Sequence, residues 1–132
     1  MPSIHDSLLT GYVVDGRNRV LTLHTEPHRG GGEAFIDLVF HGLVAYHLEG
    51  GCLRNIVLGL REVRPKDVIG DGVAFLERHR QTGWPGGWNS NTEAPEEFFS
   101  RHAVKVFELQ CSFGIMGWVA AASVEEREVA PS

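Results

Sequence analysis

The sequence predicts an α+β fold: a mostly antiparallel sheet of about six strands, with two helices inserted between strands four and five. Apolar and polar residues alternate along several short segments, which is typical of half-buried strands. One stretch in the second half of the chain repeats its apolar residues at helical spacing instead. Because the strands precede the helices rather than alternate with them, the order favours α+β over a parallel, doubly wound sheet.

Residues 8–14 and 19–25 are predicted to form a hairpin. Both segments are rich in apolar and β-branched residues, and Asp15-Gly16 between them is a strong turn signal. In the second segment Leu21 and Leu23 alternate with Val20, Thr22 and His24, so the two leucines share one face of the strand. We therefore expect these two leucines to point into the core.

Residues 34–48 are predicted to form one long strand or a bent pair. Gly42 lies on the core-facing parity without a side chain, which indicates a bulge or a bend there. After a turn at residues 49–51, residues 52–63 should pair back as a fourth strand. The side chains expected to face the core are Ile36, Leu38, Phe40, Val44, Tyr46 and Leu48.

Two helices are expected next. Residues 66–82 place apolar side chains at helical spacing, and Gly83 is a natural stop. Thr92 can cap a second, short helix that runs through Arg101.

Two closing strands are predicted at residues 104–113 and 116–124, around Gly114. The tail, residues 125–132, is charged and expected to fray. A chain of 132 residues is near the usual size of one domain, and no repeat or linker divides it. The sequence therefore predicts a single domain over residues 1–132.

The composition narrows the classes of partner. With 42% hydrophobic and 22% charged residues the chain is typical of globular proteins, and its net charge of −5 argues against nucleic acid. No apolar stretch approaches the ~20 residues that cross a bilayer, and the N-terminus does not look like a signal peptide. Cys52 and Cys111 have no CxxC spacing and are interpreted as packing residues in a reducing compartment. These features predict a cytoplasmic protein without nucleic-acid or membrane partners.

Histidines and carboxylates supply one set of candidate site residues. His24, Asp37, His41 and Glu108 could line a pocket or hold a metal if the first hairpin pairs beside the third strand. The alternative, which the pattern favours, is that the histidines are scattered and hydrogen-bonded at the surface. His41 and His47 are six residues apart, about 20 Å along an extended strand, and cannot share an ion unless that strand bends sharply.

The segment Trp84-Pro85-Gly86-Gly87-Trp88-Asn89 supplies a second set. Two tryptophans in a loop of glycine and proline are costly to expose, so they should cover something. Trp84, Trp88 and Asn89 are therefore candidate partner- or ligand-binding residues, because tryptophan is enriched at binding hot spots. The alternatives are that both rings fold back as a lid on the core, or that they bury a subunit interface.

No catalytic residue and no cofactor is assigned. The glycine-rich pieces match neither a Walker loop nor a dinucleotide-binding turn, and no GxSxG elbow occurs. The pattern leaves enzymatic activity open but leans against it.

Two short stretches carry a resemblance to a known group. Ile4-His5-Asp6-Ser7, followed by the Asp-Gly hairpin, and the later run from Phe40 to Tyr46 resemble small uncharacterised bacterial β-rich proteins. Some of that group are classed as immunity proteins, which neutralise a toxin by binding it. The resemblance covers roughly the first half of the chain and implies a stoichiometric binding protein without catalysis. It carries over no functional residues.

The leading hypothesis is thus a non-enzymatic bacterial protein that binds another protein. The second is a domain that binds a small molecule or a metal in a pocket between the sheet and the Trp84–Trp88 loop. An enzyme would belong to this second class. The third is a homodimer or other homo-oligomer of structural type.

Overall fold

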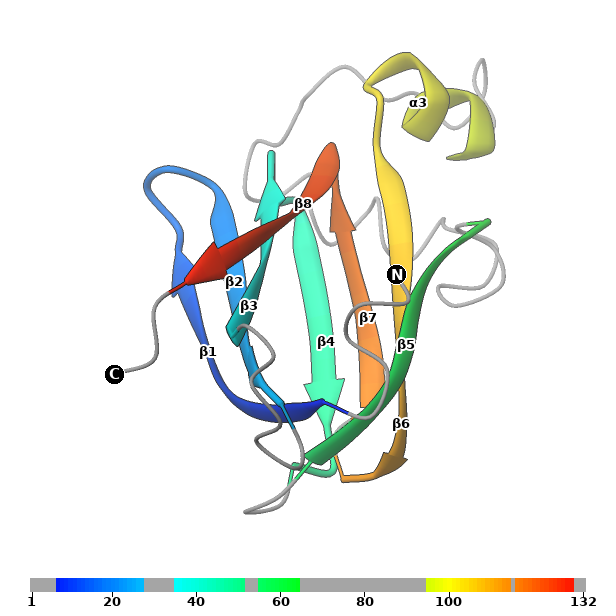
Figure 1. Cartoon of the computed structure of the whole chain (residues 1–132). Helices are drawn as coiled ribbons and strands as arrows, with labels where there is room; N and C mark the ends of the chain where they lie inside the picture. The colour runs from blue at the N-terminus through cyan, green and yellow to red at the C-terminus, as the bar shows by residue number, and fades with distance from the viewer. Residues whose placement is uncertain (1–6, 28–34, 52–54, 65–94, 115, 130–132) are drawn as a thin grey trace.

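The computed structural model describes residues 7–27, 35–51, 55–64, 95–114 and 116–129. Within these ranges the chain forms eight strands and one short helix (Figure 1). All strand pairings among them are antiparallel. The elements are β1 (Leu8–Asp15), β2 (Val20–Glu26), β3 (Phe35–His41), β4 (Ala45–Glu49), β5 (Asn55–Val63), α3 (Pro95–Arg101), β6 (Lys105–Phe113), β7 (Met116–Ala121) and β8 (Ser123–Val129).

The predicted α+β class is wrong, because the described structure is nearly all β. The helix expected over residues 66–82 lies outside the described residues, and α3 falls within the second expected helix. The expected six strands become eight because two long segments bend and each contributes two strands. Residues 125–129, expected to fray, instead belong to β8, whose backbone pairs with β3.

The sheet folds over on itself into two halves. Its strand order is β4-β7-β6-β5-β1-β2-β3-β8. β3 runs on into β4, and β7 runs on into β8, so both long segments pass from one half to the other (Figure 1). Two backbone hydrogen bonds join the segments at the bend: Ala122 N donates to His41 O at 2.9 Å, and Val44 N donates to Ala120 O at 2.8 Å.

Gly42 allows the first of these bends. Its φ of +67° is a conformation that other residues adopt at a cost. A Cβ there would lie 2.8 Å from Ala122 Cβ, so the close approach of the second segment also requires a residue without a side chain at position 42. Of the two alternatives predicted for this segment, one long strand or a bent pair, the structure has the bent pair over residues 35–49, with the bend at Gly42.

The main core lies between the two halves. Leu21 and Leu23 have no exposed surface, which confirms the predicted parity of β2. Tyr46 and Val44 were expected in this core, but Tyr46 is 40% exposed and Val44 packs in another cluster. Val44 lies in the bend itself, between β3 and β4. Tyr46 keeps the core-facing parity, because it is paired with the buried Val119, and it is exposed where β4 ends the sheet order. The buried core residues are Leu9, Leu21, Leu23, Leu38, Phe40, Val57, Leu60, Phe107, Leu109, Val119 and Ala121.

A second cluster lies where α3 packs on the sheet. Phe98 and Phe99 of the helix are buried against Val104, Val106 and Ala120. Trp118 is partly buried against the same cluster. In the part of the chain that the structure describes, no helix is long and apolar enough to cross a membrane.

Candidate functional site: a polar and aromatic groove

Side chains from three neighbouring strands form a row on the outer face of the second half of the sheet. Glu108 of β6 is paired with Trp118 of β7, and Trp118 is paired with His47 of β4. Directly paired residues of antiparallel strands project to the same face, so these three side chains lie side by side. One step further along the sheet, Met116 is paired with Glu49.

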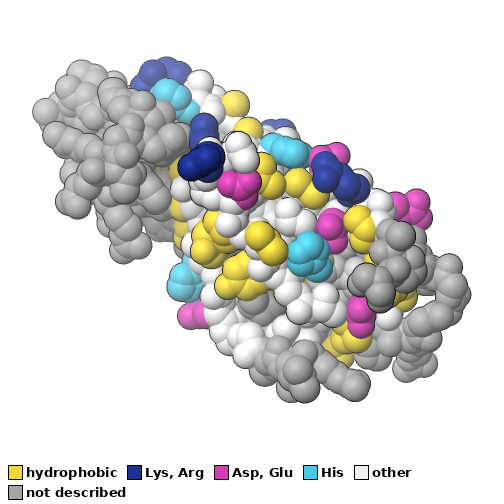
Figure 2. Space-filling model, turned by 90° about the vertical axis from the view of Figure 1, so that its left-hand side faces the viewer, with side chains coloured by type: hydrophobic (Ala, Val, Ile, Leu, Met, Phe, Trp, Pro, Cys, Tyr) yellow, Lys and Arg dark blue, Asp and Glu magenta, His cyan; other side chains and the backbone are white. Residues whose placement is uncertain are grey.

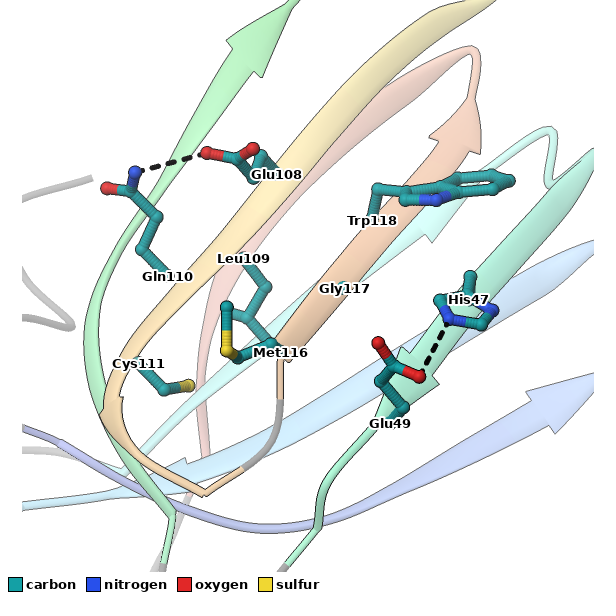
Figure 3. Close-up of a pocket in the computed structure, with 9 residues that line it drawn as sticks. All are labelled: His47, Glu49, Glu108, Leu109, Gln110, Cys111, Met116, Gly117 and Trp118. Carbon is teal, nitrogen blue, oxygen red and sulfur yellow. Dashed lines mark hydrogen bonds and ion pairs between the residues drawn. The ribbon is translucent and has the colours of Figure 1, made fainter. Parts of the chain in front are cut away.

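These residues line a groove of about 480 Å³ (Figure 3). We call it the Trp118 groove. Its lining side chains are His47, Glu49, Glu108, Gln110, Met116 and Trp118, together with Leu109, Cys111 and Gly117. The indole lies at one end of the groove and Cys111 at the other, with Met116 between them (Figure 3).

One side of the groove is formed by a histidine and a carboxylate. The His47 ring is nearly parallel to the Trp118 indole, with ring centroids 6.3 Å apart. His47 Nε2 also lies 3.3 Å from Glu49 Oε2. Both side chains of this ion pair are more than half exposed, so the pair contributes little to stability and stays open to exchange with a ligand.

The opposite side is formed by a carboxylate that its neighbours hold in place. Glu108 Oε1 accepts hydrogen bonds from Arg61 Nε at 3.1 Å and Arg61 Nη2 at 3.0 Å. The same oxygen accepts a third hydrogen bond from Gln110 Nε2 at 3.1 Å. Glu108 is therefore oriented before any ligand arrives, which lowers the entropy lost on binding.

The Cys111 thiol at the end of the groove is not a ready nucleophile. Burial raises the pKa of this thiol to about 11. At neutral pH the thiol is protonated, and only the thiolate attacks electrophiles. The expectation that Cys111 is a packing residue agrees with its contact with the main core.

Alkylation kinetics test this description of Cys111. In a Cys52→Ser variant at pH 8, we expect Cys111 to react with iodoacetamide at least about tenfold more slowly than free cysteine. The rate should keep rising towards pH 11. Over the same pH range the folded state should lose stability, because the unfolded thiol ionises first. Unfolding in urea should restore the rate of free cysteine, and a fast reaction of the folded protein would contradict the burial.

The structure brings two of the sequence-predicted residues together. His24 Nδ1 lies 2.9 Å from Asp37 Oδ1, across the pairing of β2 with β3. This pair lines a smaller pocket of about 300 Å³, whose other residues include Thr10, Glu26 and Phe35.

The other predicted residues lie elsewhere. His41 Nε2 lies 2.7 Å from Glu125 Oε1, and Arg127 Nη2 donates to the same oxygen at 2.8 Å. The hydrogen bond with His41 is the main cause that lowers the pKa of Glu125, and the one from Arg127 lowers this pKa further. Glu108 belongs to the Trp118 groove, in the other half of the sheet. Among the described residues no group of three or more His, Cys, Asp or Glu side chains could hold a metal ion, so the predicted four do not form one site.

Trp84, Trp88 and Asn89, and with them the predicted pocket beside their loop, lie outside the described residues. Of the Trp118 groove, sequence reasoning found only Glu108. His47 lies between Tyr46 and Leu48, both expected to face the core, so the alternation of the strand already indicated that His47 points outward. Nothing in the sequence shows that the strand of His47 pairs with the strand of Trp118.

Comparisons with protein-family models, with curated proteins and with solved structures find no match. The resemblance to immunity proteins therefore stays a prediction.

Proposed function

We propose that this protein is a non-catalytic binding domain, and that its Trp118 groove receives a positively charged side chain of a partner protein. The observation that carries the proposal is the position of the indole in the groove: it lies between Glu108 of β6 and His47 of β4, and Glu49 lines the same groove two residues beyond His47. This proposal retains the leading hypothesis from the sequence and assigns it a surface.

The chemistry of the groove favours a cation. An aromatic face attracts a guanidinium or ammonium group by about 0.5–2 kcal/mol, depending on how far the group is desolvated. The carboxylate of Glu49 adds charge complementarity, and Glu108 adds less because Arg61 already pairs with it. The net charge of −5 attracts cations over a longer range. Arginine fits this surface best, since its planar group stacks on the indole and also binds a carboxylate through two N–H groups.

Two small probes test the proposal. N-acetyl-arginine amide should shift the Trp118 indole N–H resonance saturably, with a Kd of about 1 mM, as expected for a single anchoring side chain. N-acetyl-citrulline amide has nearly the same shape without the charge, and it should bind at least about tenfold more weakly. NMR titration of both probes measures the difference.

Charge removal supplies the matched variants. Glu49→Gln should weaken arginine binding about threefold to tenfold, because Glu49 is the more exposed of the two groove carboxylates. Glu62→Gln removes an exposed carboxylate from β5 outside the groove and should leave binding unchanged. Equal binding of the citrulline probe, or equal losses in both variants, would contradict a cation site in the groove.

The identity of the partner and a cytoplasmic location remain predictions.

A further inference from the structure

The edge of β1 carries apolar side chains into solvent. β1 pairs with β5 only at Leu8 and Leu9, and from Thr10 onward its one pairing partner among the described residues is β2. Along this edge Tyr12 is 42% exposed, Val13 57% and Val14 37%. Figure 2 shows the side of the molecule on which β1 lies, and hydrophobic side chains gather near the centre of that face.

Two of these side chains belong to the inner face of the sheet. Tyr12 is paired with Leu23 and Val14 with Leu21, and both leucines are fully buried. Tyr46 of β4 meets Tyr12 edge to face, with ring centroids 6.3 Å apart, and is 40% exposed. Core-facing positions thus reach solvent where the two halves of the sheet meet. We call Tyr12, Val13, Val14 and Tyr46 the β1 edge patch.

Charge distinguishes the β1 edge from the two strands that end the sheet order. β4 carries His47 and Glu49, and β8 carries charged residues at four consecutive positions, 125–128. β1 has no charged residue from Leu8 to Val14. Natural proteins block exposed strand edges with charges or proline, because an unprotected edge pairs with another strand. Within β1 no charge or proline from Leu8 to Val14 gives this protection, so the edge is suited to pairing with another strand.

We propose that this strand is β1 of a second copy, paired antiparallel about a twofold axis at Val13. In this arrangement Val13 faces the partner's Val13, and Tyr12 faces the partner's Val14. Aromatic and β-branched side chains form favourable cross-strand pairs. Asp15 faces the partner's Gly11, so no like charges meet. The uncharged segment is self-complementary, as a twofold contact requires.

The size of the patch sets the strength of the dimer. From the exposed fractions, the patch presents roughly 300 Å² of surface in each copy, or about 600 Å² in the pair. Stable protein interfaces bury about 1,200–2,000 Å² in total, so this contact depends on added backbone hydrogen bonds and is weak. The dimer should therefore form only at micromolar concentrations and above.

Sedimentation velocity of the full chain tests the proposal. Between about 5 and 500 µM the average mass should rise from one chain towards two. Val13→Lys places a charge on the edge and should remain a monomer throughout. Ser100→Lys adds the same charge at an exposed position of α3 and should dimerise like the unchanged protein. Circular dichroism checks that both variants are folded.

Disulfide trapping tests the register of the pairing. In a background without Cys52 and Cys111, Val13→Cys should form a disulfide-linked dimer on mild oxidation, because the two residues face each other across the axis. Ser100→Cys should not. A monomer at every concentration, a Val13→Lys variant that still dimerises, or absence of the Val13→Cys crosslink in the dimer would each overturn the proposal.

Discussion

Replacing Gly117 with alanine is expected to lower the free energy of unfolding by about 3 kcal/mol or more, as forced overpacking does when the backbone cannot yield. A Cβ at this position would overlap His47 O and lie 2.8 Å from His47 C and 3.0 Å from Leu48 Cα. All three atoms belong to the backbone of β4, so no side-chain rotation can relieve the clash. β4 would have to separate from β7, and the histidine side of the Trp118 groove would separate with it.

Urea unfolding measures this loss. Gly59→Ala is the matched control, because Gly59 also lies within a strand and a Cβ there would meet no atom within 4 Å. We expect this control to be neutral or slightly stabilising, since alanine restricts the unfolded chain. Similar losses in the two variants would show that the close contact between β7 and β4 is not what requires Gly117.

Replacing Phe40 with alanine is expected to cost about 4 kcal/mol, within the range for large aromatic residues in a core. Phe40 has no exposed surface, and its ring centroid lies 5.7 Å from that of Phe107. The two rings come from β3 and β6, which belong to different halves of the folded sheet. The variant therefore loses packing between the halves, and the whole structure should unfold at lower urea.

The same measurement on Met116→Ala provides the contrast. Met116 is 60% exposed, and its loss should change the free energy of unfolding by less than about 0.5 kcal/mol. Fluorescence and circular dichroism should give one transition for Phe40→Ala if the two halves unfold together. Separate transitions would show that the halves do not share one core.

Features that depend on neighbouring residues could be predicted from the sequence. The Asp15-Gly16 turn joins β1 and β2 as expected, and Leu21 and Leu23 face the core. A bend at Gly42 was also predictable, because a glycine on the apolar parity of a long strand marks such a position. His24 and Asp37 lie together because their strands follow each other in the chain and pair, an arrangement that the sequence offered only as the less favoured alternative.

Features that depend on pairing between distant segments could not be predicted. The bend between β7 and β8 at Ala122 has no glycine or proline to mark it, and it arises because this segment follows the bend at Gly42. The charged residues 125–128 were expected to fray, but pairing with β3 holds them in a strand. Backbone hydrogen bonds satisfied by another segment can outweigh an unfavourable local composition.

By itself, the sequence determined the local elements of this protein: the first hairpin, the parity of β2, the bend at Gly42 and the position of α3. Only the tertiary structure decided that the sheet folds over on itself, that the class is nearly all β, and that His47, Trp118 and Glu108 share one groove. The physical reason is that strand periodicity states which face of a strand is buried. It does not state which strand lies beside it, because the hydrogen bonds that choose the neighbour are made by backbone groups common to every residue.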